Sequence, residues 1–252
     1  MKKILLTCLM LAFFSGIANA ADETEERYTK PVESTDESVT PGWSGSAGAG
    51  LLLTPGNSEN TNLNVDIESK LEQERFRHNF IASALQTEAA DEKTADKYLL
   101  GYKLDYKLTP ISYIFSALRL EVDKFSGFDR QTSLTAGYGR RLITTSKDSL
   151  DVEVGAGLRE NRFESGDKDT EAVIRGAADY HHYFTETTEF HQGLLIMAGE
   201  DNTSIDTLSA IRANIAGNLA LEAALRLKHN SEPPSGNDKT DTATTVSLVY
   251  GF

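Results

Sequence analysis

Five histidines are the residues of this sequence best suited to acid–base or metal chemistry near neutral pH. They are His78, His181, His182, His191 and His229. Nucleophilic catalysis of the common kind would need a serine that one of them activates. No serine stands in a recognisable nucleophile motif, and a catalytic triad is defined by a geometry that spacing alone does not give. The sequence therefore predicts no catalytic residue.

Metal binding requires several ligands that converge on one point. His181 and His182 are adjacent, so on a strand their side chains point to opposite faces and do not share an ion. The chain has no structural zinc spacing. Acidic stretches at 91–92, 167–171 and 200–201 lack the ordered ligand spacing of a calcium loop. The sequence predicts no metal site and no cofactor.

The amino terminus has the features of a secretory signal peptide over residues 1–20. Two lysines precede an apolar run at 4–17, and Ala18 and Ala20 form an A-x-A cleavage site. The run is too short to span a membrane as a helix. The single cysteine, Cys8, lies inside it, so we expect the mature chain to form no disulfide.

Residues 21–41 are rich in Glu, Asp, Ser and Thr and contain almost no apolar side chain. We expect a disordered acidic leader in the periplasm. Without the signal peptide, 23 basic residues face 38 acidic ones, a net charge of −15. This charge excludes nucleic acid as a partner and disfavours docking on anionic lipid.

Residues 42–252 form a series of short alternating segments, which we count as twelve. The clearest covers 97–108, where tyrosines and leucines occupy the even positions and mostly charged residues the odd ones. A period of two is typical of strands with two different faces. Turn signals recur about every 15 to 20 positions, which predicts one all-β domain.

The last strand shows the most informative pattern. Val246, Leu248, Tyr250 and Phe252 share one face, and small or polar residues occupy the other. In an outer-membrane barrel the last strand pairs with the first and faces lipid on one side. We interpret Tyr250 and Phe252 as an assembly signal for the barrel-assembly machinery. The alternative is an ordinary strand of a soluble sandwich.

Two further features favour a membrane barrel. Connections after even-numbered strands are short, and most of the others are long, notably 86–96, 160–170 and 229–241. Aromatic residues gather at the predicted periplasmic edge: Trp43, Phe76, Tyr106, Phe184, Phe190, Tyr250 and Phe252. We predict an all-β transmembrane antiparallel up-and-down β-barrel of about twelve strands over residues 42–252.

Several segments together resemble a known family. They are 42–46 (GWSGS), 53–58 (LTPGNS), 123–130 (DKFSGFDR) and 137–142 (GYGRRL). The sequence is similar to the family of salt-induced outer membrane proteins, a domain of unknown function in Gram-negative bacteria. The resemblance implies an outer-membrane β-barrel and implies no reaction.

The second face of the strands is charged with both signs and would line the lumen. The predicted lumen charges are Asp66, Glu68, Arg77, Lys103, Asp105, Arg119, Glu121, Arg141, Glu153, Arg159, Arg175, Asp179, Glu222 and Arg226, with Lys70, Asp151, Glu189 and Arg212 on the same face. Charges confined in a narrow lumen should pair across it. Two readings remain: a narrow or self-plugged pore for small solutes or ions, which the net charge would make cation-selective, and a structural or envelope-stress barrel without transport.

An outer-membrane enzyme is the third and least favoured alternative, because some twelve-stranded barrels are phospholipases that use Ser and His on the lipid-facing wall. Here His181 and His191 would face the lumen and His182 the lipid. We expect the outer membrane as the location. Expected partners are its lipid and lipopolysaccharide and, during biogenesis, periplasmic chaperones and the barrel-assembly machinery.

Overall fold

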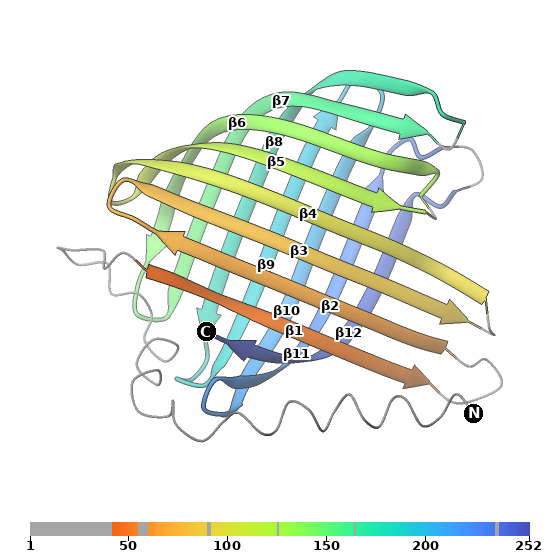
Figure 1. Cartoon of the computed structure of the whole chain (residues 1–252). Helices are drawn as coiled ribbons and strands as arrows, with labels where there is room; N and C mark the ends of the chain where they lie inside the picture. The colour runs from red at the N-terminus through yellow and green to blue at the C-terminus, as the bar shows by residue number, and fades with distance from the viewer. Residues whose placement is uncertain (1–41, 55–59, 90–91, 125, 164, 235–236) are drawn as a thin grey trace.

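The computed structural model describes residues 42–54, 60–89, 92–124, 126–163, 165–234 and 237–252. It consists of twelve strands (Figure 1). They are β1 (Gly42–Thr54), β2 (Asn60–Glu72), β3 (Phe76–Ala89), β4 (Glu92–Thr109), β5 (Ser112–Asp123), β6 (Phe128–Thr144), β7 (Asp148–Phe163), β8 (Lys168–Tyr183), β9 (Thr188–Gly199), β10 (Thr203–Ala216), β11 (Leu219–Asn230) and β12 (Thr240–Gly251).

The strands form one closed antiparallel barrel. Each strand pairs with its neighbours in sequence, and β12 pairs with β1 to close the ring. This confirms the predicted up-and-down barrel of about twelve strands. In the described ranges no helix is long and apolar enough to cross a membrane. The expected signal peptide at 1–20, with Ala18 and Ala20, and the leader at 21–41 lie outside the described residues.

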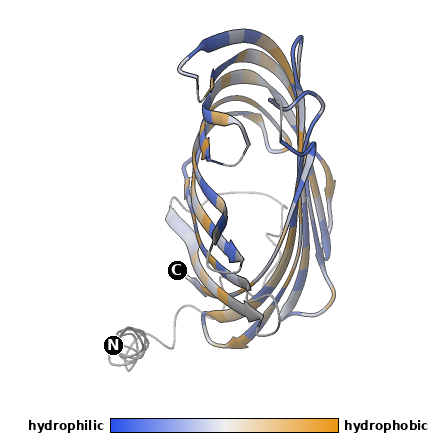
Figure 2. Ribbon diagram, turned by 90° about the vertical axis from the view of Figure 1, so that its right-hand side faces the viewer, coloured by the Kyte–Doolittle hydropathy of each residue, from blue (hydrophilic) through white to orange (hydrophobic). Residues whose placement is uncertain are grey.

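Most of the large apolar side chains of the barrel are on its outside. Ile174, Val154 and Leu158 are each more than half exposed, and similar rows of exposed apolar residues follow the other strands. The hydropathy colours accordingly alternate along the ribbons (Figure 2). A soluble monomer rarely exposes a contiguous apolar surface of this kind. The polar faces of the same strands point inward, as the alternation predicts.

Most of the predicted aromatic residues lie at the barrel end that holds the short turns and the carboxy terminus. Trp43 at the start of β1 stacks on Phe80 with ring centroids 6.1 Å apart. Phe76 at the start of β3 contacts Tyr106 edge-on at 5.3 Å. Exposed aromatic rings at one level of a barrel are typical of a membrane interface.

The seam that closes the barrel is short. Only Ser46–Gly50 of β1 and Ser247–Gly251 of β12 are in register, five pairs, whereas every other strand pair has at least ten. Phe252 extends the seam through two backbone hydrogen bonds. Its N–H donates to the Gly45 carbonyl and its carbonyl accepts from the Gly45 N–H, both at 2.9 Å. The terminal residue is therefore part of the closure.

Two loops that we expected to be long are mostly strand. In the predicted loop 86–96, β3 continues to Ala89 and β4 already begins at Glu92. In the predicted loop 160–170, β7 continues to Phe163 and β8 begins at Lys168. Both hairpins continue their backbone pairing where the apolar alternation stops, because ladder hydrogen bonds do not depend on side-chain type. The connection at 231–239 is long, as expected.

Candidate functional site: the charged lumen

The barrel encloses a cavity of about 1390 Å³ that most of the predicted lumen charges line. Those that line it are Asp66, Glu68, Arg77, Lys103, Arg119, Glu121, Arg141, Glu153, Arg175, Asp179 and Arg226. The remaining three do not line it and are held in ion pairs: Asp105 with Arg77, Arg159 with Glu171, and Glu222 with Arg212.

A cluster of four charges joins opposite walls of the lumen. Arg119 and Glu121 of β5 contact each other at 3.2 Å. Arg119 reaches Asp206 of β10 at 3.6 Å, and Glu121 pairs with Lys228 of β11. We call Arg119, Glu121, Asp206 and Lys228 the constriction cluster. Its side chains are between 11% and 23% exposed, so they are mostly buried in the lumen.

The position of these residues in the ring explains why they bridge it. Arg119 and Glu121 are two apart on β5 and therefore point to the same face. Strand β11 lies six places from β5 in a ring of twelve, which is directly opposite, and β10 lies five places away. The barrel outline is elongated in cross-section (Figure 2). This shape brings two facing walls close enough for side chains to meet.

A second group of charges fills the lumen beside β4. Arg77 Nε donates to Asp105 Oδ2 at 2.7 Å, and Asp105 is completely buried. Glu153 accepts from Lys103 and, at 2.7 Å, from Arg175 Nη2. Lys103 and Glu153 belong to β4 and β7, three places apart in the ring, so this group also ties non-neighbouring strands.

Two buried aromatic residues that we did not single out from the sequence support this second group. Tyr113 and Phe115 are about 95% buried, and Tyr113 donates to Glu153 at 3.0 Å. The Arg77 guanidinium lies 4.8 Å from the centre of the Tyr113 ring, and that of Arg175 lies 5.2 Å from the centre of Phe115. Ile114 lies between Tyr113 and Phe115 in β5 and faces outward, so the alternation of the strand alone places both rings inside.

Arg159 and Glu171 form the most deeply buried ion pair, with side chains 1% and 3% exposed. Arg159 donates to Glu171 Oε1 from Nε at 2.9 Å and from Nη2 at 2.7 Å, and to Ser204 Oγ at 3.2 Å. We expected Glu171 in an acidic loop. It lies inside β8 instead, because β8 begins three residues earlier and turns this side chain toward β7.

The acidic connection after β9 shows crowding of carboxylates. The Asp201 backbone N–H donates to Glu171 Oε2 at 3.1 Å, which holds Asp201 beside other acids. The pKa of the Asp201 carboxyl is raised. Partial desolvation is the largest cause, and the negative charges of Asp169, Glu171 and Glu200 add to it. Repulsion of this kind is typical of solvated acidic loops.

Acidic and basic side chains are equally numerous in the cavity lining, unlike in the chain as a whole. Ten carboxylates and ten Lys or Arg side chains line it. The acidic ones are Asp66, Glu68, Glu121, Asp148, Asp151, Glu153, Asp179, Asp206, Asp238 and Asp241; the basic ones are Lys70, Arg77, Lys97, Lys103, Arg119, Arg141, Arg175, Arg212, Arg226 and Lys228. Our expectation of cation selectivity, which came from the net charge, finds no support in this lining.

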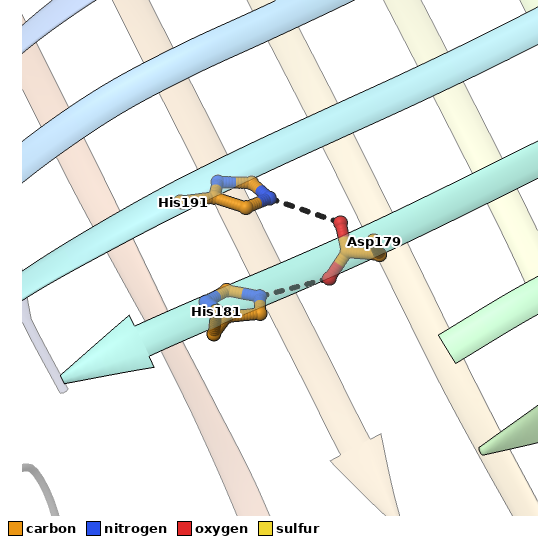
Figure 3. A group of neighbouring side chains, drawn as sticks. All are labelled: Asp179, His181 and His191. Atoms are coloured by element: carbon orange, nitrogen blue, oxygen red, sulfur yellow. Dashed lines mark hydrogen bonds and ion pairs between the residues drawn. The ribbon is translucent and has the colours of Figure 1, made fainter. Parts of the chain in front are cut away.

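The structure brings two of the histidines together with an aspartate. His181 of β8 and His191 of β9 are directly opposite in register, and both contact Asp179 (Figure 3). As the sequence predicted, His182 does not share a site with His181; it contacts Asp148 instead. In the described part of the chain, no hydrogen bond joins a histidine to a serine.

Comparison with known families identifies the family of this chain. The family described as "Protein of unknown function, DUF481" matches residues 47–252. The chain belongs to this family. DUF481 membership confirms the resemblance to a domain of unknown function, while salt induction stays a prediction. The DUF481 chain is also 28% identical over 247 residues to the uncharacterised protein YdiY of Escherichia coli (strain K12), covering 97% of this chain and 96% of YdiY.

A solved structure matches the DUF481 barrel without close sequence similarity. The crystal structure of an outer membrane channel from Pseudomonas putida F1 aligns with a TM-score of 0.50 and 13% identity. The alignment covers 86% of this chain and 100% of the channel. At this level of identity the likeness concerns the fold alone, an all-β barrel of the outer-membrane type.

Proposed function

We propose that this DUF481 protein is an outer-membrane barrel with a narrow pore for ions or small solutes, restricted by the constriction cluster. The observation that carries the proposal is the set of ion pairs from Arg119 and Glu121 to Asp206 and Lys228. They join opposite walls inside a cavity of about 1390 Å³. A barrel that only supported the envelope would not need a cavity of this size lined by charged side chains.

The outer membrane is the proposed location because the exposed outer face is apolar and the ring of strands is closed. Lipid and lipopolysaccharide would contact this face. Tyr250 and Phe252 are proposed as the signal for the barrel-assembly machinery, which would receive the chain from periplasmic chaperones. In support of this role, Phe252 hydrogen-bonds to β1 across the seam.

The modest strength of the ion pairs in the constriction cluster predicts a pore that opens intermittently. Partly exposed ion pairs each contribute about 0.2 to 1 kcal/mol, and the cluster contains two pairs between opposite walls. Together they favour the narrowed state by about 0.4 to 2 kcal/mol, roughly a two- to thirty-fold preference. Thermal motion can break pairs of this strength, so we expect brief openings of small conductance. The balanced lining predicts weak selectivity between cations and anions.

Planar-bilayer recording on the refolded full barrel tests the proposal. The parent protein should show small, intermittent steps, and Glu121→Ala combined with Lys228→Ala should raise the open fraction or the step size. Arg130→Ala combined with Glu160→Ala is the matched control, since this pair at 3.9 Å does not line the cavity. Steady conductance of general-porin size in the parent would contradict the narrowed lumen. Silence in both parent and lumen variant would favour the structural role.

A further inference from the structure

We propose that Asp179, His181 and His191 form a binding site for a divalent transition-metal ion on the lumen wall between β8 and β9. The site faces lumen water, because Asp179 is about half exposed and both imidazoles are about a quarter exposed. The inference does not depend on whether the barrel conducts.

The sheet geometry places the three side chains on one spot. His181 and His191 are cross-strand partners, and Asp179 precedes His181 by two residues on the same face. His181 Nε2 lies 2.8 Å from Asp179 Oδ1, and His191 Nε2 lies 2.9 Å from Asp179 Oδ2. One ligand atom from each residue falls within 4.8 Å of the others (Figure 3).

A metal ion fits this spot after small side-chain adjustments. Bonds of about 2.0 to 2.2 Å to nitrogen and oxygen place two ligands of a tetrahedral ion roughly 3.4 Å apart. The nitrogen–oxygen distances therefore need to open by about half an ångström. The two imidazole rings are stacked with centroids 4.3 Å apart and an interplanar angle of 4°. Turning each ring toward the ion uses χ2, which is a soft torsion.

Glu189 supplies the outer contact that metal-binding histidines usually make. His181 Nδ1 hydrogen-bonds to Glu189 Oε1 while Nε2 faces Asp179. A carboxylate on the far nitrogen fixes the tautomer that leaves Nε2 free to bind a metal. In the metal-free site His181 lies between two carboxylates that only accept hydrogen bonds, so it donates from both ring nitrogens. A metal ion between Nε2 and Asp179 would replace the Nε2 proton, which is released to water.

The negative charge of the local carboxylates also favours binding of a cation. Most lumen carboxylates pair with an arginine or a lysine, as Asp66 does with Arg226. Asp179 and Glu189 differ. Among the described residues, they form ion pairs only with histidines. Gly193, the cross-strand partner of Asp179, presents no side chain there, and an added Cβ would find its nearest neighbour at 3.7 Å. Space therefore remains beside the three ligands.

Two imidazoles and one carboxylate are a ligand set suited to Zn²⁺, Cu²⁺, Ni²⁺ or Fe²⁺ and unsuited to Ca²⁺ or Mg²⁺. Three protein ligands leave at least one position for water or a further ligand. Zn²⁺ is the appropriate probe because it binds such sites without redox chemistry, and Co²⁺ reports the coordination through its visible absorption.

The test is binding of Zn²⁺ alone to the refolded barrel in detergent at pH 7.5, followed by calorimetry. We expect one equivalent per barrel for the parent. Asp179→Ala, His181→Ala and His191→Ala should each weaken binding by more than a hundredfold, and Glu189→Gln by about tenfold, as expected for an outer contact. His182→Ala is the matched control and should bind like the parent, since His182 faces the outside.

Folding of every variant is checked by the gel shift between unheated and boiled samples. A variant that does not fold is replaced by Asp179→Asn or His191→Gln, which keep the side-chain volume. Co²⁺ should give visible bands in the parent and in His182→Ala that are lost in the ligand variants. Absence of a one-to-one Zn²⁺ event in the folded parent, or equal binding by all variants, would overturn the proposal and leave a hydrogen-bonded cluster without a metal.

Discussion

Replacing Arg159 by alanine should destabilise the barrel more than any other single loss of a lumen charge. The guanidinium is 1% exposed and makes hydrogen bonds to Glu171, Ser204 and the Asn202 carbonyl, tying β7 to β8 and β10. The variant removes all of these at once. It also leaves the Glu171 carboxylate, 3% exposed, without its cation.

The magnitude follows from this burial. Breaking a buried pair by removing one partner costs about 3 to 5 kcal/mol, mainly because the remaining charge stays desolvated. Glu171 keeps hydrogen bonds from Asn161 Nδ2 at 3.1 Å and from the Asp201 N–H at 3.1 Å. These two contacts partly compensate, so we expect a value near the lower limit, about 3 kcal/mol.

Urea titration of the refolded barrel, followed by tryptophan fluorescence of Trp43, measures this loss. Arg130→Ala is the control, because its pair with Glu160 is 3.9 Å long and both side chains are more than a third exposed. The control should lose less than about 1 kcal/mol. Equal losses in the two variants would refute the reasoning. A double variant, Arg159→Met with Glu171→Leu, should recover much of the loss, since it leaves no buried charge unpaired.

Three further predictions concern assembly and orientation. Deleting Phe252 removes both seam hydrogen bonds to Gly45, so the amount of heat-modifiable folded barrel in the outer membrane should fall; unchanged assembly would contradict a role in closure. Gly45→Ala should also slow folding, because the added Cβ would collide with the backbone carbonyl oxygen of Glu68 and would lie 2.8 Å from Cζ of the Phe252 ring, whereas Gly176→Ala, with nothing within 4 Å of the added Cβ, should fold at the parent rate. A cysteine at Asp167 should react with an impermeant thiol reagent on intact cells and one at Glu74 should not, since these residues lie at opposite barrel ends; the reverse labelling would invert the topology.

The sequence was sufficient for the fold because alternation is a local property. Tyr98, Leu100 and Leu108 all face outward, and the two-residue turn at Gly217 and Asn218 lies where the dipeptide predicts it. Strand ends were less predictable. The mostly polar segments 86–89 and 160–163 carry no apolar period, yet backbone pairing continues through them.

The contacts inside the lumen depend on information that one strand does not contain. The period places Arg119 and Glu121 inside, but only the closure and flattening of the ring bring Lys228 to Glu121. In the same way, His181 and His191 are ten positions apart in the sequence, and only the register of β8 against β9 makes them partners. Spacing can show which face a residue occupies, and register decides which residue it meets.

The most direct test of the constriction is thiol modification of Glu121→Cys during bilayer recording. The sequence contains one other cysteine, Cys8, within the expected signal peptide, so the reagent has a single target in the processed chain. A small positively charged methanethiosulfonate and its negatively charged counterpart should each change the step size within one recording, because position 121 lies where the walls meet. Mass spectrometry would confirm that the thiol has reacted. A modified thiol with unchanged current would contradict the central claim, because ions would then pass without meeting the constriction cluster.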